Sequence, residues 1–266
     1  MFRQLSSDAR EMLTELVQYR ELLYQMTRRD LLLRYKQTVM GFGWAIFMPL
    51  LNTAVFSVIF TRVAPIDVGL PYPLFAYCGL VTWNFFAASL RFSVGSLTTN
   101  TSLVTKVYFP REIFPLSSVL VCLVDFAVAS LVLIVLMAIY GVWPSWTVAF
   151  LPIVVAVHGA MTVAVALLVA MGNLFYRDVK YLFEVVITVW MFATSVLYPI
   201  DRVGGTVGRL MRLNPLTPIT EAYRDVIFFG RPPSAEFAAA SALSLVLLAW
   251  CWLAFHRAEF RFAENI

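Results

Sequence analysis

Residues 113–176 read IFPLSSVLVCLVDFAVASLVLIVLMAIYGVWPSWTVAFLPIVVAVHGAMTVAVALLVAMGNLFY, and they decide the fold. Asp125 is the only formally charged residue in this stretch, which is too long for one membrane crossing, because about 20 apolar residues span a bilayer. The GVWPSW sequence at 141–146 divides it, since Gly and Pro interrupt helices and Trp favours the membrane interface. We therefore predict two spans, near 116–140 and 147–172.

Further stretches with little or no formal charge lie on both sides of this region. They predict four more spans, near 43–61, 74–92, 182–199 and 237–255. The whole chain is 61% hydrophobic and only 14% charged, whereas soluble domains carry about 25% charged residues. The sequence predicts an all-α integral membrane protein with six transmembrane helices.

The distribution of Lys and Arg predicts the orientation of these spans. Six crossings put both termini on one side, together with the loops at 91–115 and 173–181. That side carries 14 of the 20 Lys and Arg residues, and such residues accumulate on the cytoplasmic side of a membrane. We expect both termini to be cytoplasmic, and we expect no cleaved signal peptide.

The first 36 residues form a separate N-terminal unit ahead of the transmembrane domain at 37–266. Apolar residues recur there at spacings of three and four, with charges elsewhere around the helix, which is typical of an amphipathic helix lying on a membrane surface. A helix that packs on a soluble partner is the alternative interpretation. The apolar positions are Met12, Leu16, Tyr19, Leu23 and Met26.

The segment at about 200–236, between the last two spans, is too long for a simple turn. Thr217 can cap a helix with Pro218 at its first position, and Gly230 can end it. We predict a short amphipathic or re-entrant helix that forms an external gate; a plain extracellular cap is the alternative. One face would hold Ile219, Ala222, Tyr223, Val226 and Ile227, opposite Glu221, Arg224 and Asp225.

Motifs for chemistry are absent from the sequence. It has no phosphate-binding GxxxxGK[ST], no HExxH, no GxSxG and no CxxC. The three cysteines are far apart, and we interpret His158 and His256 as structural. We expect no catalytic residue, no metal site and no cofactor in this chain, and no binding of nucleic acid.

Asp125 is an ionisable group inside a predicted span, which is a functional hypothesis by default. It could act as a proton relay. A relay needs several titratable partners, however, and the neighbouring predicted spans supply few. We therefore favour a hydrogen-bonded or protonated packing role.

Four peptides carry a resemblance to a known family. The chain resembles the membrane (permease) subunits of type-2 ATP-binding-cassette (ABC) exporters of lipid-linked polysaccharide, such as O-antigen, capsule or teichoic acid. The resemblance implies a homodimer in the bacterial plasma (inner) membrane, working in lipopolysaccharide biosynthesis or a similar pathway. The peptides are RDLLLRYKQTVMGFGWAIFMPLL (29–51), VYFPREIFPLSSVL (107–120), NLFYRDVKYL (173–182) and NPLTPITEAYRDVIFFG (214–230).

The resemblance also implies two copies of a separate cytoplasmic ATPase, which would hold the ATP and Mg²⁺. A coupling helix at about 98–113 would dock on that subunit through apolar anchors, oriented by charges at the rim and a proline turn. A solvated interfacial loop is the alternative. The predicted docking residues are Lys106, Val107, Tyr108, Phe109, Pro110, Arg111 and Glu112.

A polysaccharide conduit would be lined by aromatic side chains that stack on sugars, although each could equally face lipid or pack internally. Candidates are Trp44, Phe47, Phe56, Trp190, Tyr198 and Tyr223. Arg34, Tyr35 and Lys36 could receive the lipid pyrophosphate at the entrance, since such side chains suit phosphate. Alternative functions are export of a small amphiphile or drug, and proton-coupled secondary transport through Asp125.

Overall fold

The computed structural model describes residues 14–36, 38, 40–41, 43–101, 103, 109–259 and 262. All regular structure within these ranges is helical. Five helical stretches are long and apolar enough to cross a membrane, and they agree with five of the six predicted spans. They are Gly43–Val63, Tyr72–Asn100, Ile113–Tyr140, Trp146–Phe175 and Ala235–Ala258.

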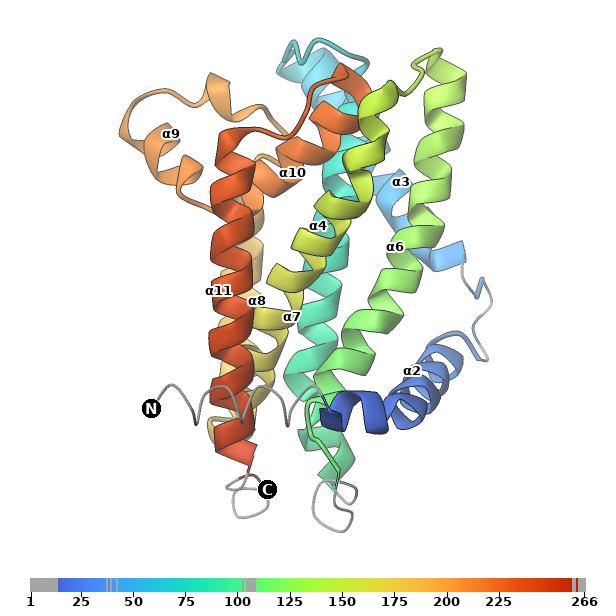
Figure 1. Cartoon of the computed structure of the whole chain (residues 1–266). Coiled ribbons are helices and arrows are strands. Elements are labelled where there is room, and N and C mark those ends of the chain that lie inside the picture. The colour runs from blue at the N-terminus through green and yellow to red at the C-terminus, as the bar shows by residue number, and fades with distance from the viewer. Residues whose placement is uncertain are drawn as a thin grey trace.

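Helix α4 (Tyr72–Ser96) is the centre of the bundle (Figure 1). It packs against α3 (Gly43–Val58), α6 (Ile113–Tyr140) and α7 (Leu151–Phe175), and α11 (Ala235–Ala258) packs on the far side of α7. Most residues of α4 are therefore buried, although it is less hydrophobic than α6. A central position lets α4 carry polar residues that a lipid-facing helix would not tolerate.

The predicted fifth span corresponds to α8 (Val179–Phe192), which has 14 residues. At 1.5 Å per residue it is about 21 Å long, shorter than the roughly 30 Å hydrocarbon core of a bilayer. The chain leaves the helix at Ala193, so the predicted span at 182–199 is helical only as far as Phe192. The contacts that replace the helix there are described below.

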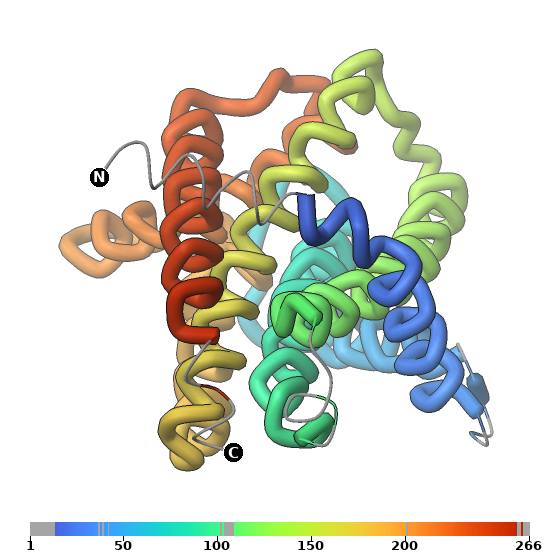
Figure 2. The backbone as a smooth tube through the Cα atoms, turned by 60° about the horizontal axis from the view of Figure 1, so that its bottom comes forward, coloured from blue at the N-terminus to red at the C-terminus, as the bar shows by residue number. Residues whose placement is uncertain are grey.

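Helix α2 (Arg20–Tyr35) runs across one end of the bundle, against α6 (Figures 1 and 2). Met26 on its inner face is buried, and Tyr19 and Leu23 pack beside the same apolar cluster. This agrees with the predicted amphipathic pattern; Met12 lies outside the described residues. The start of α6 and the end of α11 lie at this same end of the bundle.

The opposite end holds α9 (Gly205–Arg212) and α10 (Leu216–Arg224), which continues as a π-helical turn, η5 (Asp225–Phe229). The helix predicted in this segment is present, and it ends at Gly230, whose φ of 62° favours glycine. Its predicted cap is wrong. The Thr217 hydroxyl donates to the carbonyl of Met211 instead, and the amide of Leu216 donates to Asn214 Oδ1.

Candidate functional site

The predicted docking segment turns inward where the structure describes it. Phe109 is only 3% exposed and packs against Phe114, with ring centroids 5.5 Å apart. Both belong to an apolar cluster that closes this end of the bundle with Leu174 and Phe255. Phe109 therefore packs inside this chain in the structure, and its role as an anchor in a partner stays a prediction. Pro110 is buried beside it.

The two charged residues that follow also face this chain. The Arg111 guanidinium lies 3.3 Å from Glu259 Oε1, and its backbone N–H donates to the same oxygen. Glu112 Oε1 lies 3.3 Å from His256 Nδ1. Burial, and then the nearby charge of Glu112, raise the pKa of Glu259 to about 7. Arg111 and Glu112 thus do not form the rim of a docking surface in this conformation.

The remaining predicted docking residues, Lys106, Val107 and Tyr108, lie outside the described residues. The short helical turn η2 (Thr98–Asn100) is the described beginning of the coupling region predicted at 98–113. Docking of a partner through the coupling region predicted at about 98–113 stays a prediction.

Asp125 is paired rather than alone. Arg34 forms an ion pair with its carboxylate, and the Tyr35 hydroxyl donates to the same group. The Arg34 guanidinium also lies 3.7 Å above the centre of the Phe92 ring, a favourable cation–π position. Burial, and then the hydrogen bond to Asp125, raise the pKa of the Tyr35 hydroxyl well above its ordinary value. Asp125 therefore fastens α2 to α6.

This pairing changes the interpretation of the three residues predicted to bind the lipid pyrophosphate. Arg34 and Tyr35 are already engaged by Asp125, whereas Lys36 is exposed. Asp125 lies about 90 positions away in sequence, so no local pattern connects it to Arg34. One signal could have suggested the pair. It is an apolar span with a single acid, together with a nearby amphipathic helix that has an arginine on its inner face.

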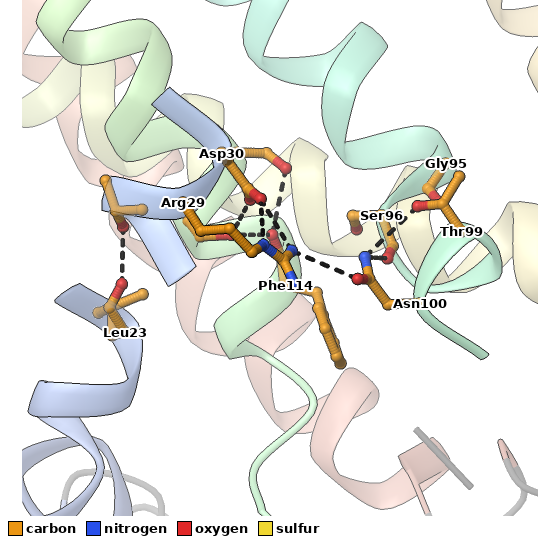
Figure 3. Close-up of polar contacts among 11 residues, drawn as sticks. Leu23, Arg29, Asp30, Gly95, Ser96, Thr99, Asn100 and Phe114 are labelled. Atoms are coloured by element: carbon orange, nitrogen blue, oxygen red, sulfur yellow. Dashed lines mark hydrogen bonds and ion pairs between the residues drawn. The ribbon is translucent and has the colours of Figure 1, made fainter. Parts of the chain in front are cut away.

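A polar junction lies beside this pair, between α2, α4 and α6 (Figure 3). Arg29 binds Asp30 at 2.8 Å and Asn100 at 3.3 Å, and the Ser117 hydroxyl donates to Asp30. A cavity of about 540 Å³ opens here, lined in part by Arg29, Arg34, Phe92 and Asn100. Guanidinium groups at its wall can bind phosphate or carboxylate oxygens.

The chain after α8 is held by side chains instead of helical hydrogen bonds. Arg224 donates to the carbonyl oxygens of Ser195 and Val196, each at 2.6 Å, and to that of Phe75 at 3.3 Å. Asn214 donates to the carbonyl of Ala193. Non-helical backbone at membrane depth survives only where protein covers it. This requirement explains why α8 can end early.

Arg224 itself is only 2% exposed. The prediction that it lies on a polar outer face of α10 is therefore wrong. Its guanidinium is sandwiched between α4 and the 193–196 turn, 3.5 Å from the centre of the Phe75 ring. Carbonyl oxygens accept from both terminal nitrogens of Arg224, whereas its buried Nε has no hydrogen-bond partner among the described residues.

Gly79 on α4 makes this close approach possible. A Cβ added there would lie 2.2 Å from the Val196 carbonyl oxygen and 2.4 Å from an Arg224 nitrogen. Gly79→Ala is expected to lower the free energy of unfolding by about 1–3 kcal/mol, as overpacking does. Thermal unfolding in detergent measures the effect.

The matched control is Gly159→Ala on α7. A Cβ added at Gly159 meets no described atom within 4 Å. Alanine there is expected to be neutral or stabilising by about 0.5–1 kcal/mol, because it favours the helix. Equal melting temperatures for the two variants would contradict the close contact at Gly79.

The six predicted pathway aromatics fall into two groups. Trp44 and Phe47 on α3 are each more than 40% exposed. Phe56, further along α3, is partly buried and stacks on Phe60, facing the start of α4. The exposed pair could therefore contact lipid, a second copy or a substrate, whereas Phe56 packs internally.

The other three aromatics lie around α8 and α10. Trp190 donates to Asn214 Oδ1 at 3.0 Å and packs against Phe86. The Tyr198 hydroxyl donates to the carbonyl of Phe192. Tyr223 is 2% exposed, and its hydroxyl lies 3.2 Å from His158 Nδ1. In this conformation Trp190 and Tyr223 support the protomer's own packing.

These features define a polytopic α-helical membrane protein. At one end of its bundle, α2 runs across the other helices and forms a polar junction with α4 and α6. The model of the family described as ABC-2 type transporter matches residues 21–228, most of the chain. The chain belongs to this family.

Individual relatives extend the match to nearly the full length. The O-antigen export system permease protein RfbA of Myxococcus xanthus is 33% identical over 255 residues, which cover 95% of this chain and 98% of that protein. Two proteins of the same name from Klebsiella pneumoniae are 28% and 29% identical over 246 residues, covering 92% of this chain and 94% of each relative.

Proposed function

We propose that this chain is the permease subunit of an ATP-driven exporter that moves a lipid-linked cell-surface polysaccharide, such as O-antigen, across the bacterial plasma membrane. The main observation that supports this proposal is the similarity to an O-antigen export permease over 95% of the chain. The family membership and the bundle of apolar helices support a transport subunit.

The proposed topology has six crossings, with α8 and the covered turn after it as the fifth. The end of the bundle that holds α2 faces the cytoplasm, and α9 and α10 lie on the outer side. Two protomers pair through exposed apolar faces of α3 and α8, which become the walls of a conduit. These faces carry Trp44, Phe47 and Leu51 on α3, and Leu182, Val185 and Val189 on α8.

Trp44 and Phe47 are proposed to be the conduit aromatics that stack on sugars in this conformation, because both are exposed along α3. Contact of a sugar with Tyr223 needs a rearrangement of α10, the helix that carries this buried side chain. At the cytoplasmic entrance, exposed Lys36 and the guanidinium-lined cavity at Arg29 would receive the lipid pyrophosphate.

A deletion and complementation experiment tests the function. A strain without this gene is expected to lose surface polysaccharide and to accumulate the lipid-linked polymer inside, and the intact gene restores export. Resistance to small amphiphilic drugs should not change. Loss of drug resistance with normal surface polysaccharide would instead support the rival exporter of small amphiphiles.

Energy is proposed to come from a separate ATPase that docks on the coupling region at about 98–113. Tyr108→Ala is expected to weaken co-purification with that ATPase by a factor of roughly 30, or about 2 kcal/mol, as loss of an interface anchor does. The measurement is the ATPase retained on the tagged permease across a dilution series.

Tyr140→Ala is the matched control, because Tyr140 is an exposed tyrosine at the opposite end of the bundle, at the end of α6. It should leave assembly unchanged. If Tyr108→Ala also leaves assembly unchanged, this segment is a solvated loop and the docking surface lies elsewhere.

A further inference from the structure

Three potential metal ligands meet at the end of the bundle where α6 begins and α11 ends. Glu112 directly precedes α6, His256 is in the last turn of α11, and Glu259 follows that helix. Glu112 is more than 140 positions from the other two in sequence, whereas His256 and Glu259 are three positions apart, so the fold brings Glu112 to this pair. The distance of Glu112 along the chain explains why no spacing motif in the sequence predicted a metal site.

The distances suit a small divalent ion. His256 Nδ1 lies 3.3 Å from Glu112 Oε1 and 3.7 Å from Glu259 Oε2. One ligand atom from each residue lies within 4.8 Å of the other two. Bonds of roughly 2.0–2.2 Å in a tetrahedral zinc site place neighbouring ligand atoms about 3.3–3.6 Å apart, so only small side-chain shifts are needed.

Glu112 provides a second observation. It is 2% exposed, and its Oε2 atom has no hydrogen-bond partner in the part of the chain that the structure describes. A buried carboxylate oxygen without a partner is costly, and such an atom commonly indicates a missing ion or water. An ion between the two glutamates would satisfy it.

Arg111 orients the second carboxylate. Its backbone N–H and its Nη1 atom both donate to Glu259 Oε1, at 3.1 and 3.3 Å. The other oxygen, Oε2, is therefore the one directed to His256. Hydrogen bonds of this kind fix ligand orientation in metal sites. The guanidinium also offsets one negative charge, which favours moderate rather than very tight binding.

We propose that Glu112, His256 and Glu259 bind one divalent transition-metal ion, with Zn²⁺ the best fit. One imidazole and two carboxylates suit Zn²⁺, whereas Mg²⁺ and Ca²⁺ prefer oxygen ligands alone. Three protein ligands leave a position for water. The ion would link Glu112, the last of the predicted docking residues, to the end of α11. Binding of the ion does not depend on the proposed transport function.

The test measures metal bound to the full-length protein, purified in detergent with a tag that lacks histidine. After EDTA treatment and dialysis, ZnCl₂ is added and bound metal is counted by mass spectrometry. We expect one Zn²⁺ per chain, retained in excess MgCl₂, and a higher melting temperature with zinc. Glu112→Gln and His256→Gln should each remove the bound zinc and the thermal shift.

Glu184→Gln is the control, because Glu184 is an exposed carboxylate elsewhere, paired with Arg91. It should bind zinc as the unchanged protein does. If Glu112→Gln does not fold, Glu259→Gln gives the same test. Absence of zinc, or zinc retained in these variants, overturns the proposal.

Discussion

The Arg224→Leu variant is expected to lose at least about 3 kcal/mol of unfolding free energy. Its guanidinium is the hydrogen-bond donor to the carbonyl oxygens of Ser195, Val196 and Phe75. Each buried carbonyl left without a partner costs roughly 1–3 kcal/mol. Leucine fills much of the volume but donates nothing, so the turn after α8 should loosen from α4.

Thermal unfolding in detergent and the recovery of folded protein measure this loss. The stability of Arg224→Lys should fall between that of the unchanged protein and that of Arg224→Leu. A single ammonium keeps the charge but lacks the planar fork that reaches several carbonyls. The control is Arg209→Leu, which changes an exposed arginine on the neighbouring helix α9. If Arg209→Leu and Arg224→Leu destabilise equally, the bridging role of Arg224 is wrong.

The interruption of α8 also shows where sequence reasoning stops. Five spans could be predicted because the length of a charge-free stretch and the thickness of a bilayer are enough to define them. The sequence ATSV at 193–196 contains no Gly or Pro, so nothing local predicts a break. The break depends on Arg224 and Asn214, which come 20 to 30 residues later and supply donors to the freed carbonyls.

The same distinction holds for the candidate site. The apolar face of α2 could be predicted, because it is a local periodic pattern, but its packing against this chain's own bundle could not, since a membrane surface or a soluble partner would suit the same pattern. The direction of Phe109, Arg111 and Glu112 could not, since it depends on Phe255, His256 and Glu259 at the far end of the chain. Without those contacts, a loop with aromatic and charged residues is typical of a docking surface. The partners of Asp125 are hidden for the same reason.

Asp125→Asn is expected to destabilise the junction of α2 and α6 by about 3 kcal/mol, because it leaves a largely buried Arg34 without its counter-charge. The side chains of Arg34 and Asp125 are 19% and 21% exposed, so solvent screens the pair weakly. Arg34→Gln should cost a similar amount by exposing the carboxylate to an apolar surrounding. Unfolding in detergent measures both variants.

The double variant Arg34→Gln/Asp125→Asn separates an ion pair from a proton relay. For an ion pair, the two changes partly compensate. The double variant should therefore lose about 0.5–3 kcal/mol less unfolding free energy than the two single variants lose together. Export of polysaccharide should then recover in the double variant relative to Asp125→Asn. A relay predicts the opposite, since no carboxyl group remains to carry a proton. Two outcomes would contradict the ion pair: strictly additive losses of stability, and a double variant that folds well but does not export. In either case the pairing with Arg34 would not explain why α6 carries an acid within its apolar length.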